Sequence, residues 1–108
     1  MDFETITFER DGAVAIITLN RPDAANSLNA KMSEELLKVA THCDSNSEVR
    51  AVVFTGAGKM FSAGGDLHSF AAEGEGMPEY MRYATAGLHA AVSRFARMNA
   101  PFLVAVNG

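Results

Sequence analysis

The sequence predicts a mixed α/β fold in which strands and helices alternate along the chain. Three observations lead to this prediction. A run rich in β-branched residues spans Val14 to Asn20, a helical pattern of apolar residues begins near Ala30, and a second apolar run spans Val49 to Thr55. A strand, a helix and a further strand in this order favour parallel strands joined by a right-handed crossover. At 108 residues, the chain corresponds to one domain or to part of one.

The first half of the chain is predicted to form a hairpin, a loop and a helix. Residues Phe3 to Arg10 alternate between two faces, and Asp11-Gly12 marks a tight turn before the next strand. The stretch from Arg21 to Leu28 shows no sustained period, which is typical of an irregular loop. Asn29 is expected to cap a helix that starts near Ala30. The apolar face of this helix is expected to consist of Met32, Leu36, Val39, Ala40 and Cys43.

The second half is predicted to contain a buried strand, a short helix, a long helix and a last strand. The run Val49 to Thr55 is typical of a buried parallel strand. A short helix is expected to end near Ala72, and Pro78 suits the first turn of a longer helix, which Pro101 terminates. Phe102 to Val106 is a continuous apolar strand. The buried face of the long helix is expected to carry Met81, Ala84, Leu88, Ala91, Val92, Phe95 and Met98.

The composition indicates a globular protein and argues against a nucleic-acid partner. The chain is 48% hydrophobic, carries a net charge of −4 and has a pI near 5.2. It offers no basic stripe that would neutralise a row of phosphates. No run approaches the ~18 apolar residues that would span a bilayer, and Met1 to Arg10 lacks the features of a signal peptide. We therefore expect a soluble, cytoplasmic protein with no membrane partner, in which the single cysteine, Cys43, is buried and reduced.

The segment from Phe61 to Leu67 gives the strongest chemical signal. Gly64, Gly65 and the small Ala63 would let a ligand approach the backbone closely, and the helix expected next would present free N–H groups. Such a corner can stabilise an oxyanion. The same glycines could instead form a simple strand-to-helix turn, and their spacing alone leaves both interpretations open.

Other motifs are incomplete. Gly56-Ala57-Gly58-Lys59 resembles part of a phosphate-binding loop, but Val53 takes the place of its first glycine and Met60 that of its Ser or Thr. The dinucleotide fingerprint fails because Phe61 stands where its third glycine belongs. Ser62 lacks the G-x-S-x-G frame of a hydrolase nucleophile and is interpreted as structural. No metal site is predicted, because no metal-ligand spacing relates the three histidines, His42, His68 and His89.

Three blocks of sequence together resemble one known family. They are R-P-D-A-A-N-S-L-N at Arg21 to Asn29, V-V-F-T-G-A-G-K-M-F-S-A-G-G-D-L at Val52 to Leu67, and P-F-L-V-A-V-N-G at Pro101 to Gly108. Their order and spacing are similar to those of the enoyl-CoA hydratase/isomerase (crotonase) superfamily. The resemblance covers essentially the whole chain and implies the N-terminal part of a crotonase-like (ClpP/crotonase) spiral of ββα units. It also implies an acyl-CoA thioester as substrate, no separate cofactor, and a homotrimer or a dimer of trimers.

The resemblance also assigns roles to residues. It implies that the backbone N–H of Gly65 is the first of two donors to the thioester oxygen as this becomes an enolate oxyanion; one such donor contributes about 2.7 to 4 kcal/mol. It places the carbonyl of Ala63 against the adenine and the loop from Ala24 to Ser27 along the coenzyme A. Asp66 is expected to cap a helix or position the ligand rather than transfer a proton. The expected substrate-binding residues are Ala24, Ser27, Ala63, Gly64, Gly65, Asp66 and Leu67.

The other half of the site is expected beyond residue 108. In the family, the second donor follows V-N-G by a few residues and the usual hydratase glutamates lie farther on. Arg21 or Lys59 is expected to meet the phosphates of coenzyme A, and Glu73, Glu75 and Glu79 are interpreted as solvated residues. The complete protein is predicted to be an enoyl-CoA hydratase. An isomerase of the same superfamily and a catalytically inactive fragment are the open alternatives.

Overall fold

A computed structural model describes all 108 residues and contains one four-stranded sheet in the order β1-β2-β3-β4. The first two strands form an antiparallel hairpin, and the remaining neighbours pair in parallel. The hairpin turns at Gly12, whose φ of 61° is readily adopted by glycine, as the Asp-Gly pair predicts. The strands are β1 (Ile6–Asp11), β2 (Val14–Leu19), β3 (Ala51–Gly56) and β4 (Phe102–Val104).

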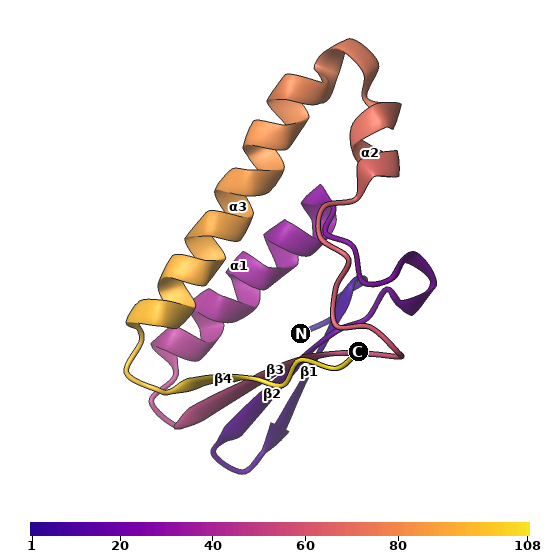
Figure 1. The fold of residues 1–108 in the computed structure, drawn as a ribbon. Helices are drawn as coiled ribbons and strands as arrows, with labels where there is room; N and C mark the ends of the chain where they lie inside the picture. The colour runs from indigo at the N-terminus through magenta and orange to yellow at the C-terminus, as the bar shows by residue number, and fades with distance from the viewer.

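Helical connections join the parallel strands. One long helix links β2 to β3 and another links β3 to β4; Figure 1 shows both on the same side of the sheet, and they pack side by side. The chain therefore has the predicted α/β architecture. None of the helices combines the length and the apolar character that crossing a bilayer requires. The helices are η1 (Pro22–Ala24), α1 (Ala30–Ser45), α2 (Leu67–Ala72), η2 (Gly74–Gly76) and α3 (Met77–Arg97).

The parallel register brings three connecting segments to one edge of the sheet. Leu19 pairs with Gly56, so the segments that follow β2 and β3 leave the sheet side by side. The segment after β4 joins them. The side-chain amide of Asn107 donates hydrogen bonds to the carbonyls of Gly56 (2.9 Å) and Gly58 (3.0 Å). The backbone carbonyl of Asn107 accepts a hydrogen bond from the N–H of Phe61 (2.9 Å). This edge is where the glycine-rich turn lies.

The first long helix confirms its predicted start and buried face. α1 begins at Ala30, and the side chain of Asn29 accepts a hydrogen bond from the N–H of Met32 at 2.9 Å. Burial raises the pKa of the Cys43 thiol to about 11, against the opposing charge of Arg10, so the thiol stays protonated at neutral pH. The five predicted positions are all buried: Met32, Leu36, Val39, Ala40 and Cys43.

The predicted buried face of α3 is wrong at two positions. Ala84, Ala91 and Phe95 are buried as expected, but Met81 is 38% and Val92 58% exposed. Met81 belongs to the first turns of α3, which extend past the sheet (Figure 1). Val92 borders an open pocket above the sheet. The helical period therefore identifies the apolar stripe of α3, but α1 and the sheet cover only part of this stripe.

The last two strands are shorter than their apolar runs predict. β3 begins at Ala51, because the N–H of Val49 closes the turn after α1 by donating to the carbonyl of Asn46 at 3.0 Å. β4 ends at Val104, two residues before its predicted end. Beyond this point the hydroxyl of Thr55, rather than a backbone N–H, donates to the next carbonyl at 2.8 Å. One backbone hydrogen bond continues past each of these ends, from Arg50 to the carbonyl of Ala13 (2.8 Å) and from Ala105 to the carbonyl of Phe54 (2.9 Å), before turn and side-chain hydrogen bonds take over.

A buried carboxylate fixes the start of β1. Glu35 of α1 is 5% exposed and accepts hydrogen bonds from the N–H groups of Glu4 (2.7 Å) and Thr5 (2.8 Å) and from the Thr5 hydroxyl. The N–H groups of these residues thus bind a side chain, and β1 begins at Ile6 instead of Phe3. Burial alone would raise the pKa of Glu35, but these hydrogen bonds and the charge of Lys31 leave it below its ordinary value of 4.5.

We expect Glu35→Gln to lower the free energy of unfolding by about 1 to 3 kcal/mol at pH 7, because a charged acceptor of buried donors is lost. The folded-state pKa lies below the ordinary value of 4.5, so this stabilisation is present above pH 4.5 and disappears as the pH falls through the folded-state pKa. Urea unfolding at pH 7 and pH 3 measures it. The exposed Glu48 provides a control, since Glu48→Gln removes the same charge; an equal effect of both changes would contradict the assignment.

Candidate functional site

The loop after β2 and the turn after β3 lie against each other at the edge of the sheet. The N–H of Ala63 donates to the carbonyl of Ala25 (3.0 Å), and the N–H of Leu28 to the carbonyl of Gly64 (2.7 Å). The N–H of Asp66 donates a hydrogen bond to the carbonyl of Leu28 at 2.9 Å. These hydrogen bonds form a short parallel bridge between two loops. They bring together the two groups of predicted site residues, Ala24 with Ser27 and Ala63 to Leu67.

Gly65 presents a free N–H group within this turn. The N–H of Gly64 donates to the Ser62 hydroxyl at 3.1 Å and that of Asp66 to the carbonyl of Leu28, but the N–H of Gly65 makes no hydrogen bond within the chain. Gly65 is exposed and precedes α2, so its N–H is not part of a helical turn. Gly64 has a φ of 100°, which favours glycine, and it turns the backbone at this point.

Asp66 caps α2, as the sequence predicts. Its carboxylate accepts hydrogen bonds from the N–H (3.2 Å) and hydroxyl (2.8 Å) of Ser69, and forms an ion pair with Arg21 at 3.0 Å. Asp66 is only 7% exposed. Burial would raise the pKa of Asp66, but the hydrogen bonds from Ser69 and the charge of Arg21 hold it below its ordinary value. An ionised carboxylate is suited to capping; its contact with a substrate stays a prediction.

The guanidinium of Arg21 is engaged within the protein. Besides Asp66, it contacts the carbonyl (2.6 Å) and hydroxyl (3.3 Å) of Ser27. Both terminal nitrogens of Arg21 thus fix the loop against the turn, and its contact with phosphates stays a prediction. Lys59, the other expected cation, is exposed and forms no ion pair within the chain.

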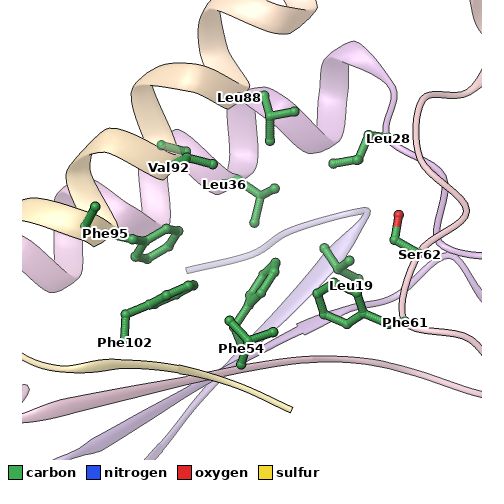
Figure 2. A pocket seen from close by; sticks show the side chains of 13 residues that line it. Leu19, Leu28, Leu36, Phe54, Phe61, Ser62, Leu88, Val92, Phe95 and Phe102 are labelled. Atoms are coloured by element: carbon green, nitrogen blue, oxygen red, sulfur yellow. The ribbon is translucent and has the colours of Figure 1, made fainter. Parts of the chain in front are cut away.

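An apolar pocket of about 350 Å³ begins beside the turn and continues between the sheet and the long helices. Figure 2 shows Leu28 and Ser62 at one end, with Phe95 and Phe102 at the other. Ser62 is the one polar residue in the lining; its hydroxyl donates to the carbonyl of Asn26 at 2.9 Å, consistent with a structural role. Because Val92 in the lining is exposed, the pocket is open to solvent.

Comparison with known proteins gives the family. A family model described as "Enoyl-CoA hydratase/isomerase" matches residues 9–108, almost the entire chain. The chain belongs to the enoyl-CoA hydratase/isomerase family. Its fold is therefore the N-terminal portion of a crotonase-like fold, and the resemblance of the three sequence blocks is confirmed.

Proteins from several bacteria resemble the chain over all or part of its length. A "Probable enoyl-CoA hydratase" of Rhodobacter capsulatus is 40% identical over 108 residues, covering 100% of this chain and 40% of the relative. The "Trans-2-decenoyl-[acyl-carrier-protein] isomerase" of Streptococcus mutans is 40% identical over 67 residues, covering 62% of this chain and 26% of that protein. A crystal structure of an enoyl-CoA hydratase/isomerase from Mycobacterium paratuberculosis superposes with a TM-score of 0.86 at 37% identity, covering 100% of this chain and 43% of the other. The chain thus spans 40% or less of the length of the curated relatives named here.

Asn26 is a structural residue of the site that sequence reasoning missed. It is fully buried, and its side chain accepts from the N–H of Arg21 (2.8 Å) and donates to the carbonyls of Ala57 (2.9 Å) and Met60 (2.8 Å). Its φ is 52°, a left-handed conformation that asparagine tolerates better than most residues. This tolerance is the signal in the sequence: an asparagine within an irregular loop can both turn the backbone and bind a second loop.

We expect Asn26→Ala to lower the free energy of unfolding by about 1 to 3 kcal/mol, because three partly buried backbone groups lose their partner. The loop after β2 and the turn after β3 should also separate. The activity of the intact protein should therefore fall further than the smaller fraction of folded protein alone would cause. Asn20→Ala is the control, since Asn20 is exposed and its side chain makes no hydrogen bond. Urea unfolding of both variants tests this, and equal midpoints would contradict the role of Asn26.

The three glutamates that follow the turn in sequence form no side-chain hydrogen bond with it. Glu73, Glu75 and Glu79 are all exposed, in agreement with their interpretation as solvated residues. Of the histidines, His42 packs edge-on against Phe8 with ring centroids 5.5 Å apart. No three His, Cys, Asp or Glu side chains lie close enough together to hold a metal ion.

Proposed function

We propose that the intact protein hydrates 2-enoyl-CoA thioesters and that the N–H of Gly65 is one of two donors to the enolate oxygen. The observation that supports this proposal is the unbonded N–H of Gly65 between two bonded neighbours. A donor held in place before reaction stabilises charge that develops in the transition state without first having to reorganise. The second donor and the carboxylates that move protons belong, by family resemblance, to residues beyond 108.

The coenzyme A portion of the substrate is proposed to lie along Ala24 to Ser27 and Ala63. The carbonyl of Ala63 accepts no hydrogen bond within the chain, and Ala63 is exposed, so this carbonyl is available to the amino group of an adenine. Leu67 is 76% exposed beside the turn and offers an apolar contact. Lys59 is the free cation nearest in sequence to the turn and is proposed to meet a phosphate.

The reaction requires no separate cofactor in this proposal, because coenzyme A is part of the substrate. The thioester makes the neighbouring carbon acidic enough for proton transfer once its oxygen is stabilised. We also propose that the intact protein assembles as a homotrimer or a dimer of trimers, as the family resemblance implies, and that it is cytoplasmic, as its composition suggests.

An isomerase that moves the double bond of an enoyl thioester is the second candidate. It would use the same Gly65 donor and differ in the residues that move protons. The relative from Streptococcus mutans named as an isomerase matches part of the same segment, at 40% identity, and supports keeping this candidate.

The test uses the full-length gene product that contains residues 1–108, with 2-enoyl and 3-enoyl esters of coenzyme A. A hydratase converts crotonyl-CoA to the 3-hydroxy ester and incorporates oxygen from ¹⁸O-labelled water. An isomerase converts the 3-enoyl ester to the 2-enoyl ester without incorporating that label. Formation of the labelled hydroxy ester is the expected result; no conversion of either ester would support the inactive alternative and contradict the proposal.

A further inference from the structure

The aromatic ring of Phe70 lies directly against the Gly65 peptide. An ideal Cβ placed on Gly65 would be 2.9 Å from Cε2 and 3.1 Å from Cζ of Phe70. Real Cβ atoms almost never lie closer than 3.0 Å to another heavy atom, so the ring occupies the space beside the Gly65 Cα. Phe70 is partly buried, although α2 contains no fully buried residue. The ring thus turns inward from an otherwise exposed helix.

Tyr80 of α3 holds this ring in place. The two rings meet edge to face, with centroids 5.7 Å apart and an interplanar angle of 64°. The hydroxyl of Tyr80 accepts a hydrogen bond from the N–H of Ala30, the first residue of α1, at 3.0 Å. The N–H groups of the first turn of a helix have no partner within the helix, so this hydrogen bond satisfies one of them. Tyr80 therefore ties α3 to α1 and supports Phe70 against the turn.

Phe70 and the loop proposed to bind coenzyme A approach Gly65 from different segments. Within that loop, Ala24 to Ser27, the carbonyl of Ala25 accepts a hydrogen bond from the N–H of Ala63, on the N-terminal side of Gly65. Gly64 and Asp66 pair instead with Leu28, which follows the loop. Phe70 approaches Gly65 from α2, on the C-terminal side. In the proposed binding mode, a thioester on the N–H of Gly65 with its coenzyme A along Ala24 to Ser27 would extend its acyl group toward Phe70.

We propose that Phe70, held by Tyr80, is a specificity-determining residue that limits the size of the acyl group next to the thioester carbonyl. This inference rests on the proposed function of Gly65. An oxygen bonded to the Gly65 N–H lies about 2.9 Å from the nitrogen, which is itself about 1.46 Å from the Gly65 Cα. The oxygen and the ring therefore lie beside the same residue, and in this proposal a substituent on the carbon next to the carbonyl reaches the ring.

The test compares crotonyl-CoA with its 2-methyl derivative, which adds one methyl group at the carbon next to the carbonyl. In the full-length gene product, Phe70→Ala is expected to raise the ratio of kcat/KM for the methylated ester to that for crotonyl-CoA by about tenfold or more, as for a methylene-sized change in an apolar pocket. Phe70→Leu should raise it less, because leucine fills part of the space. Tyr80→Phe should also raise it, since the ring pair loses its hydrogen bond to Ala30.

The control is Tyr83→Phe, because Tyr83 lies on the same helix but binds Glu34 at the exposed surface. This control should leave the ratio unchanged. A ratio within twofold of wild type in the Phe70 variants, with crotonyl-CoA still hydrated, overturns this inference and leaves the proposed function standing. Failure of the wild-type protein to act on either ester overturns both. Circular dichroism reports folding, and Phe70→Leu decides the question if Phe70→Ala does not fold.

Discussion

Gly65→Pro is expected to lower kcat of the full-length protein by about a hundredfold or more, the usual effect of removing one oxyanion donor. Proline has no N–H, so the change deletes the unbonded donor at Gly65 and keeps the N–H groups of Gly64 and Asp66. The donor acts on charge that is larger in the transition state than in the bound substrate, so kcat should fall much more than binding of the coenzyme A ester. Steady-state hydration of crotonyl-CoA and titration with a CoA ester measure the two effects.

Gly65→Ala is the matched control, because it adds a side chain and keeps the N–H. Its Cβ would approach Cε2 of Phe70 to 2.9 Å, so the end of the ring must move slightly, while the Gly65 N–H is kept. We expect a much smaller loss of kcat than with proline. Equal losses in the two variants would show that crowding rather than the missing donor lowers activity.

Asp66→Asn is a second control within the same turn. Asparagine keeps one oxygen that can accept from the N–H of Ser69, but it loses the second oxygen, which accepts from the Ser69 hydroxyl and pairs with Arg21. We expect a loss of stability and only a small loss of kcat, since Asp66 is proposed to position the turn. A loss as large as that of Gly65→Pro would show that the carboxylate takes part in the reaction.

The features that the sequence predicted depend on residues close together in the chain. The cap at Asn29, the apolar stripe of α1 and the Asp-Gly hairpin turn all arise from neighbours within one or two turns, and each is confirmed. The three sequence blocks placed the chain in its family, which the family comparison confirms. The local pattern therefore indicated the architecture and the place of the glycine-rich turn.

The features that the sequence did not predict are contacts between distant segments. Arg21 pairs with Asp66, which is 45 residues away, and Tyr80 accepts from Ala30 over a separation of 50 residues. Asn26 binds carbonyls 31 and 34 residues farther along the chain. No periodic pattern encodes such pairs, because each depends on how the loops meet at the edge of the sheet. Local signals located the turn, whereas these contacts hold it in place.

The exposed apolar surface above the sheet bears on how residues 1–108 behave alone. Val92 is 58% and Val104 46% exposed, and both line the open pocket. Apolar surface that stays in contact with water favours association between chains. Any assay of the isolated segment must therefore include circular dichroism and a measurement of its oligomeric state.

Residues 1–108 alone are expected to show no measurable hydration of crotonyl-CoA and to bind CoA esters weakly, even when folded. They supply one oxyanion donor, and none of their carboxylates matches the family's proton-transferring glutamates. The missing donor and the missing proton transfer act on the same transition state, so their effects on the rate multiply. Following the enoyl absorbance beside the full-length protein tests this. Turnover by the segment itself would contradict the proposed division of the site and would mean that an acid or base lies among residues interpreted as structural, with Asp66 and His68 the first to replace.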